Sequence, residues 1–151
     1  MSYDYPWIYK GKEFTSDDIG KYYGFVYRIT NTINGHDYIG RKFFHTIKKR
    51  PPLKGKKNKR HSKVETDWKT YWGSSEQLLA DINTHGKEKF TREIIRLCNT
   101  RGETNYCEAY YQFIEGVLLK ENNYNGIINI RLGGNSVKGL LLEDLNTKTK
   151  L

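Results

Sequence analysis

The sequence predicts a small α/β (α+β) fold, a three-stranded, mainly antiparallel sheet flanked by helices. Two runs rich in aromatic and β-branched residues, 24–30 and 36–40, surround the dipeptide Asn34-Gly35. Asn-Gly between two such runs is a strong signal for a β-hairpin, because both residues tolerate the positive φ angles of a type I′ turn. A third run, 90–97, supplies another strand, and the stretches on either side of it carry apolar residues at helical spacing.

The chain of 151 residues has the length of one ordinary domain, and we expect residues 1–151 to fold as a single unit. Within it we distinguish an aromatic lead-in at 1–23, a core at 24–132 and a tail at 133–151. Residues 15–18, Thr-Ser-Asp-Asp, predict a capped single helical turn in the lead-in. The aromatic residues around this turn are expected to pack on the sheet.

After the hairpin, the sequence predicts a short helix at 42–49. This helix would end before Pro51, because proline disfavours helical conformation in the residue that precedes it. A loop at 54–63 follows, and 65–71 is expected to contain a helical piece.

A better helix begins after Ser74 or Ser75, either of which can serve as its N-cap, and ends at His85-Gly86. Its apolar residues recur at near-helical spacing: Leu78, Leu79 and Ile82. The third strand, at 90–97, comes directly after this helix.

Thr104 is the expected N-cap of the last long helix, whose predicted buried stripe is Tyr106, Tyr110, Phe113, Ile114 and Val117. Glu108 falls on the opposite face of this helix, so it need not lie in the core. Residues 124–132 are expected to form a short strand or extended segment, and 140–145 a leucine-rich turn.

Positive charge is concentrated in one segment, which we describe as a basic insertion at 41–63. It contains eleven Lys or Arg and no Asp or Glu, so it carries +11 while the rest of the chain carries −2. Such a segment is either a solvated, mobile stretch or a surface that neutralises phosphates. Apolar anchors within it favour nucleic-acid contact: Phe43, Phe44, Ile47 and Leu53.

Composition excludes several classes of protein. No apolar run approaches the ~20 residues of a membrane span, and the first residues lack the layout of a secretory signal. Cys98 and Cys107 are too few, and the four histidines too scattered, for a structural zinc site. We therefore expect a soluble intracellular protein, in which a disulfide between the two cysteines is possible but disfavoured.

The hairpin resembles that of the GIY-YIG nucleases. Phe25-Val26-Tyr27 stands in place of the family's first triplet, and Tyr38-Ile39-Gly40 matches the second triplet without change. The Tyr-Trp-Gly-Ser-Ser element at 71–75 is similar to that of small, free-standing, phage-type members. Further residues keep the family's order and rough spacing as far as Arg131: Leu78-Leu79, Gly86, Phe90, Glu93-Ile94-Ile95, Glu108 and Tyr124-Asn125.

The resemblance implies that Glu108 holds one divalent metal ion. Mg²⁺ or Mn²⁺, with most of its coordination positions filled by water and phosphate, suits a lone carboxylate. Without the resemblance, Glu108 would be interpreted as a solvated helical residue.

The resemblance also implies that Tyr27 acts as the general base toward the attacking water and that Tyr38 positions the water or the phosphate. A free phenol has a pKa of about 10, so Tyr27 needs neighbouring cations or the metal ion to favour its phenolate. Both tyrosines could instead serve strand packing alone.

The family places an arginine about two helical turns after the second triplet, and here the chain departs from that pattern. The candidate cations are Arg41, Lys48 and Arg50, of which the two arginines suit phosphate better because a guanidinium binds it with a planar fork. His45 is a candidate to protonate the leaving group or assist the base.

Asn125 matches the family's late asparagine, which would hold the metal-bearing helix against the sheet; an ordinary turn residue is the alternative. A helix N-terminus near 72–75 could bind phosphate. The residues expected to contact nucleic acid are Lys42, Lys48, Lys49, Lys54, Lys56, Lys57, Lys59, Arg60, Lys63, Ser74 and Ser75.

The sequence thus predicts a metal-dependent endonuclease with one active site per chain, with DNA favoured over RNA as the substrate. The protein would be a monomer or a homodimer in the cytoplasm, that of the host if the chain is phage-encoded. The alternatives are a non-catalytic nucleic-acid-binding module that retains the fold and, third, a protein-interaction factor.

Overall fold

The computed structural model describes residues 3–147, and its centre is a five-stranded sheet with the strand order β2-β1-β7-β3-β4. The strands are β1 (Ile8–Tyr9), β2 (Lys12–Glu13), β3 (Gly24–Asn31), β4 (Asp37–Phe43) and β7 (Phe90–Cys98). β3 pairs antiparallel with both β4 and β7, whereas β1 runs parallel to β7. The predicted three-stranded antiparallel unit is confirmed as β7-β3-β4, and the lead-in extends it by a short hairpin.

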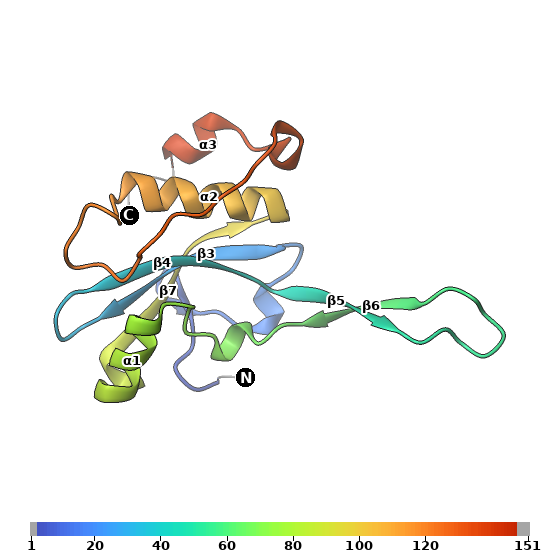
Figure 1. Ribbon diagram of the computed structural model, residues 1–151, viewed down its shortest axis with the longest axis horizontal. Helices are drawn as coiled ribbons and strands as arrows, with labels where there is room; N and C mark the ends of the chain where they lie inside the picture. Colours follow the sequence, from blue (N-terminus) through green and yellow to red (C-terminus); the bar gives the residue numbers. More distant parts are fainter. Residues whose placement is uncertain (1–2, 148–151) are drawn as a thin grey trace.

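Helices cover both faces of this sheet (Figure 1). α2 (Arg101–Ile114) lies across one face with α3 (Leu142–Thr147) beyond it, and α1 (Glu76–His85) lies on the other side. Four single turns of 3-10 helix connect these elements: η1 (Ser16–Asp18), η2 (Trp68–Thr70), η3 (Lys87–Lys89) and η4 (Gly134–Val137). Within residues 3–147, no helix combines the length and the apolar content that crossing a membrane requires.

The short helix predicted at 42–49 is wrong. Lys42 belongs to β4, and β5 (His45–Arg50) pairs antiparallel with β6 (Arg60–Glu65), so the last four residues of the loop predicted at 54–63 are also in a strand. The backbone of Phe44 explains the difference: its N–H donates to the Tyr23 carbonyl and its carbonyl accepts from Thr66 N–H. Because these partners lie outside 42–49, the backbone there is extended.

The two-stranded unit formed by 45–65 projects from the body at the end opposite the β3–β4 turn, and we call it the arm (Figure 1). Residues 51–59 form its tip, and every residue of the tip is exposed. Phe44 is fully buried at the base, where it packs against the rings of Phe14, Phe25 and Trp68.

The helix termini around the third strand are partly as predicted. Ser75 caps α1 by accepting a hydrogen bond from Leu78 N–H, and the helix ends at Gly86, whose φ of 92° suits glycine. The N-cap predicted at Thr104 is wrong: Thr100 caps α2 and accepts from Glu103 N–H.

The buried stripe predicted for α2 is correct only in part: Val117 is buried and Tyr106 and Tyr110 pack partly buried on the core, but Phe113 and Ile114 are exposed. The helix is rotated about its axis from the predicted orientation. Cys107 and Tyr111 face the sheet and pack with Val26 and Ile39, whereas the Phe113 side chain is 66% exposed. The face of α2 that carries Gln112 is consequently turned toward β4, since the Gln112 amide donates to the Ile39 carbonyl at 2.9 Å.

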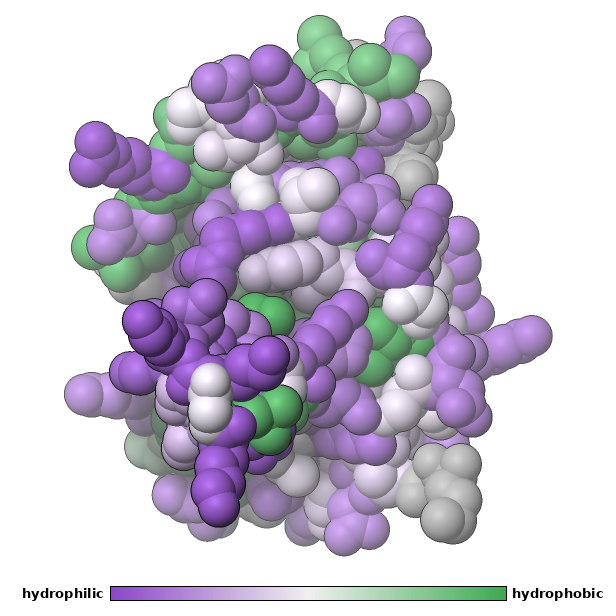
Figure 2. All heavy atoms as spheres, turned by 90° about the vertical axis from the view of Figure 1, so that its right-hand side faces the viewer, coloured by the Kyte–Doolittle hydropathy of each residue, from purple (hydrophilic) through white to green (hydrophobic). Residues whose placement is uncertain are grey.

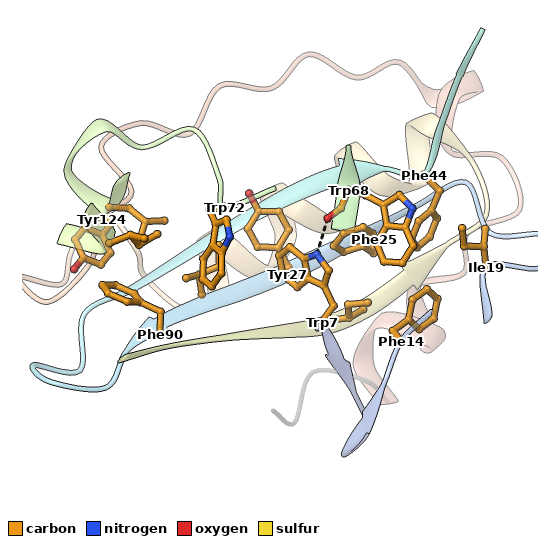
Figure 3. Close-up of a cluster of buried hydrophobic side chains, with 14 residues drawn as sticks. Trp7, Phe14, Ile19, Phe25, Tyr27, Phe44, Trp68, Trp72, Phe90 and Tyr124 are labelled. Atoms are coloured by element: carbon orange, nitrogen blue, oxygen red, sulfur yellow. Dashed lines mark hydrogen bonds between the residues drawn. The ribbon is translucent and has the colours of Figure 1, made fainter. Parts of the chain in front are cut away.

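The lead-in packs aromatic side chains on the α1 face of the sheet, as predicted (Figure 3). Trp7 is fully buried, lies 4.9 Å from the Tyr27 ring between centroids, and donates its indole N–H to the Trp68 carbonyl at 2.7 Å. The capped turn predicted at 15–18 is present as η1. Residues 124–132 contain no strand and run as an extended segment beside β4. The Tyr124 N–H donates a hydrogen bond to the carbonyl of Asp37 on β4.

Candidate active site

The β3–β4 register brings the two tyrosines of the hairpin to one face of the sheet. Tyr27 lies directly opposite Gly40, and Tyr38 precedes Gly40 by two residues, so all three share that face. A Cβ atom at position 40 would lie 2.5 Å from the Tyr27 hydroxyl and 2.8 Å from the Tyr38 ring. Only glycine therefore lets the two rings approach each other across β4.

A loop before α1 completes the tyrosine cluster. The Tyr71 and Tyr38 rings each lie 6.2 Å from the Tyr27 ring between centroids, and the Tyr38 hydroxyl is 3.1 Å from the Ser74 hydroxyl. Gly73, between these loop residues, has a φ of 89°, and a Cβ atom there would lie 3.3 Å from the Tyr38 ring, closer than ordinary van der Waals contact. In Figure 3, Tyr27 lies in the aromatic row between Trp72 on one side and Trp7 and Trp68 on the other.

The environment of Tyr27 favours the protonated phenol. Its side chain is only 1% exposed, and burial raises the pKa of Tyr27 well above its usual value, with Tyr38, Tyr71 and Glu108 adding to the rise. The pKa of Tyr38 is also raised by burial, but its contact with Ser74 acts in the opposite direction. Tyr38 is thus the more accessible of the two and the one that contacts a second hydroxyl.

Glu108 and Arg41 lie on the opposite face of β4 from the tyrosines. Arg41 follows Gly40, so its side chain turns toward α2, where its Nε lies 3.5 Å from Glu108 Oε1. Burial raises the pKa of Glu108, and the positive charge and backbone N–H of Arg41 partly offset this rise. Both side chains remain in reach of solvent, with exposures of 38% for Arg41 and 20% for Glu108.

The two faces meet because β4 is an edge strand of the sheet. Side chains from either face can reach around that edge, and Tyr38 and Glu108 line one pocket of about 630 Å³ there. The other residues of its wall come from α1, α2 and the extended segment: Ser74, Ser75, Glu76, Gln112, Tyr124, Asn125, Gly126, Ile127 and Asn129. This pocket is the candidate active site.

Asn125 fastens the extended segment to the edge of β4. Its side-chain oxygen accepts from Ile39 N–H at 2.9 Å and its amide donates to the Ile39 carbonyl at 2.8 Å. Gln112 on α2 donates to the same carbonyl. Asn125 itself ties the extended segment to β4, and Gln112 ties α2 to it, so the role predicted for Asn125 in holding α2 against the sheet stays a prediction.

The donor set of the pocket suits a hard divalent cation. Glu108 presents a partly buried carboxylate toward an open space that phosphate and water can enter, and oxygen ligands are those that Mg²⁺ and Mn²⁺ prefer. Among residues 3–147, no three His, Cys, Asp or Glu side chains cluster as a metal site. Glu76 at the start of α1 is a second carboxylate in the wall of the same pocket.

Several predicted site residues lie on the arm and do not join the pocket. His45 pairs with Glu65 at the base of the arm, and its pKa is lowered first by burial and then by Lys63. Arg50 is at the far end of β5, where its Nε donates to the Ser62 hydroxyl at 2.7 Å. Of the three candidate cations, the structure brings only Arg41 to Glu108; Lys48 is on the arm as well.

The structure adds Arg92, which the sequence did not identify. Its side chain is 3% exposed, and its guanidinium stacks on Trp7 and Trp72 and donates to the carbonyls of Tyr5, Lys69 and Tyr71. Burial lowers the pKa of Arg92 to about 10. Arg92 thereby holds the loop that places Tyr71 against Tyr27. In the sequence, the only indication of this role is that Arg92 shares one face of the strand with Phe90 and Ile94.

A family model described as "Putative endonuclease segE, GIY-YIG domain" matches residues 7–128, most of the chain. The chain belongs to this GIY-YIG family. The matched range includes both tyrosines, the arm, the α2 carboxylate and Asn125, so the GIY-YIG domain contains every residue of the pocket wall except Asn129. The comparisons found no similar protein among curated proteins and no similar solved structure.

Proposed function

We propose that the protein is a DNA endonuclease that hydrolyses phosphodiester bonds with the help of Mg²⁺ or Mn²⁺ held at Glu108. The observation that carries this proposal is the meeting of Tyr38, Arg41 and Glu108 around the edge of β4. Tyr38 and Glu108 line one open pocket, and Arg41 lies beside Glu108. A hydroxyl, a carboxylate and a guanidinium, the groups that phosphodiester hydrolysis requires, are thus close together.

Arg41 is the cation of the site. Its guanidinium is partly exposed, rests on the Phe43 ring at 4.9 Å and lies beside Glu108, so it is oriented before a substrate arrives. A planar guanidinium binds two phosphate oxygens at once, which stabilises the charge that develops at phosphorus.

Tyr38 is the tyrosine that contacts the attacking water. Its hydroxyl reaches the pocket and is oriented by Ser74, whereas the Tyr27 hydroxyl is buried above Gly40. Tyr27 acts on Tyr38 by packing against it and by sharing the tyrosine cluster, so it is a positioning residue. The role of general base that the family resemblance implies for Tyr27 has little support in its environment.

Glu108 would hold the divalent cation, leaving water and phosphate to complete the shell. A bound Mg²⁺ or Mn²⁺ would offset the charge that develops on the phosphate and favour deprotonation of a neighbouring water or hydroxyl. The raised pKa of Glu108 fits this role, because a carboxylate that burial destabilises gains from a nearby positive charge.

The test is cleavage of supercoiled plasmid and of branched DNA by the full chain, with Mg²⁺ and with chelator. We expect cleavage only with Mg²⁺, and we expect Glu108→Gln to abolish it while duplex binding in chelator stays within a few-fold. Glu121→Gln is the matched control, since Glu121 is exposed and does not line the pocket.

Full activity of Glu108→Gln would contradict the assignment of the metal to this residue. Absence of cleavage by the unaltered protein on every DNA, with tight binding retained, would instead favour the non-catalytic binding module.

A further inference from the structure

The arm is a two-stranded antiparallel ribbon with an unusual charge distribution. Within 41–63 there is no acidic residue, and the arm reaches away from the rest of the molecule (Figure 1). Figure 2 looks toward the end of the arm, and hydrophilic side chains dominate the surface nearest the viewer. A ribbon of two strands is one of the elements that fit into the major groove of duplex DNA.

The register of the ribbon separates its side chains into two faces, because residues directly opposite each other point to the same side. One face carries His45, Ile47, Lys49, His61, Lys63 and, at the base of the arm, the acidic Glu65. The other carries Thr46, Lys48, Arg50, Arg60, Ser62 and Val64. Only the second face carries arginine.

Arg50 and Arg60 are opposite each other at the outer end of this second face. Like charges in that position destabilise a ribbon, and among residues 3–147 neither arginine has a carboxylate within ion-pair distance. The repulsion between the two arginines thus destabilises the folded arm, and binding of an electron-rich partner would offset this repulsion.

The hydrogen bonds of the two arginines show how they would meet that partner. Arg50 Nε donates to the Ser62 hydroxyl at 2.7 Å, and Arg60 Nε donates to the Pro51 carbonyl at 3.2 Å. Each guanidinium is therefore fixed to the arm through Nε, while its two terminal amino groups remain available at an exposed position. Two parallel donors match the O6 and N7 acceptors of guanine in the major groove.

We propose that the arm enters the major groove of duplex DNA with the arginine face toward the bases, and that Arg50 and Arg60 read guanine. The lysines of the tip and of the other face would contact the phosphates on either side. This rests on the proposed function in one respect, namely that the bound duplex is the one that reaches the pocket.

The length of the ribbon sets the distance between recognition and cleavage. Arg41 and Arg50 are nine residues apart along β4 and β5, a span of at most ~30 Å at ~3.3 Å per residue. One base pair occupies ~3.4 Å of the duplex axis, so the preferred guanines would lie within about nine base pairs of the cut.

The experiment selects duplexes bound by the full chain from a randomised pool, in chelator, so that its outcome does not depend on cleavage. We expect guanine to be enriched at one or two positions, and replacement of those guanines by 7-deazaguanine to weaken binding ~5-fold or more. The double variant Arg50→Lys with Arg60→Lys keeps both charges, so it should lose the guanine enrichment and retain the salt dependence of binding.

Lys56→Ala with Lys57→Ala is the control at the tip, which should weaken binding to all duplexes and keep the enrichment. A pool without enriched positions, or an unchanged preference in the double lysine variant, would overturn the proposal. If the protein enriches guanine but cleaves no DNA, recognition by the arm is supported and only the proposed nuclease function is contradicted.

Discussion

At the scale of single residues, the pocket separates two tyrosines that the hairpin places side by side. Tyr27 and Tyr38 flank Gly40, yet one is buried in the aromatic core and the other reaches the pocket and Ser74. We therefore expect their hydroxyls to contribute differently to the proposed reaction, although their rings are neighbours.

Replacing each tyrosine by phenylalanine measures this difference. We expect Tyr38→Phe to lower the single-turnover rate by ~10²- to 10⁴-fold, the usual contribution of a group that handles the proton of the nucleophile. Tyr27→Phe should cost less, because it deletes a positioning hydroxyl. Saturating Mg²⁺ and enzyme in excess isolate the chemical step from product release. A larger loss of rate in Tyr27→Phe than in Tyr38→Phe would mean that Tyr27 on β3 is the general base.

If Glu108 holds the metal ion as proposed, it links metal binding to folding stability, and the sign of the effect follows from its raised pKa. A carboxyl group whose pKa is higher in the folded than in the unfolded protein stabilises the fold at low pH and loses that effect as the pH rises through the folded value. At neutral pH without metal, its carboxylate is therefore unfavourable, and Glu108→Gln should unfold at the same or a higher temperature.

Adding Mg²⁺ should reverse this ranking. The unaltered protein should gain thermal stability as the metal concentration passes its dissociation constant, whereas Glu108→Gln should show no gain. Thermal unfolding at neutral pH with chelator and with increasing Mg²⁺ provides the readout. An equal response of both proteins would mean that the metal binds elsewhere.

At the scale of elements, local patterns predicted the hairpin and α1 well, and long-range packing decided the rest. The hairpin and the cap at Ser75 depend on neighbouring residues, so the sequence alone could indicate them. The type I′ turn predicted at Asn34-Gly35 is wrong, because residues 32–36 connect the two strands and, of the pair, only Gly35 has a positive φ. The rotation of α2 could not be predicted, because its tyrosines give more than one plausible apolar stripe. The contact of Arg41 with Glu108 joins residues 67 positions apart and likewise leaves no local signal.

The prediction of a helix in the arm is wrong for a related reason. Neither face of β5 and β6 is packed against a core, so the alternation of apolar and polar residues that marks a half-buried strand is absent. The charge of the arm could be recognised from the sequence, whereas its strand structure could not.

Arg92 controls the position of the loop that completes the tyrosine cluster. Arg92→Met should lower the free energy of unfolding by roughly 2–5 kcal/mol, because it leaves three carbonyl groups without their donor. Chemical denaturation measures this loss, and Arg131→Met serves as the control at an exposed arginine. A loss below ~1 kcal/mol would show that other contacts hold the loop.

At the scale of the whole molecule, we expect the basic arm to determine how DNA binding depends on salt concentration. Reversing Lys56, Lys57 and Lys59 to Glu should weaken binding to all duplexes and reduce the slope of log affinity against log salt by about 0.9 for each phosphate that the arm no longer neutralises. The matched control reverses three exposed lysines of the body, Lys87, Lys120 and Lys138, which changes the net charge equally. Equal slopes for the two triple variants would show that net charge, and not the arm, attracts DNA.

The bonds to Ile39 have a consequence for solubility. A strand at the edge of a sheet offers unpaired N–H and C=O groups to any other chain, and β4 is such a strand. Asn125 occupies the N–H and C=O groups of Ile39, and the Tyr124 N–H occupies the Asp37 carbonyl. The extended segment thus shields β4 from edge-to-edge pairing, and without it concentrated protein would be expected to self-associate into β-rich aggregates.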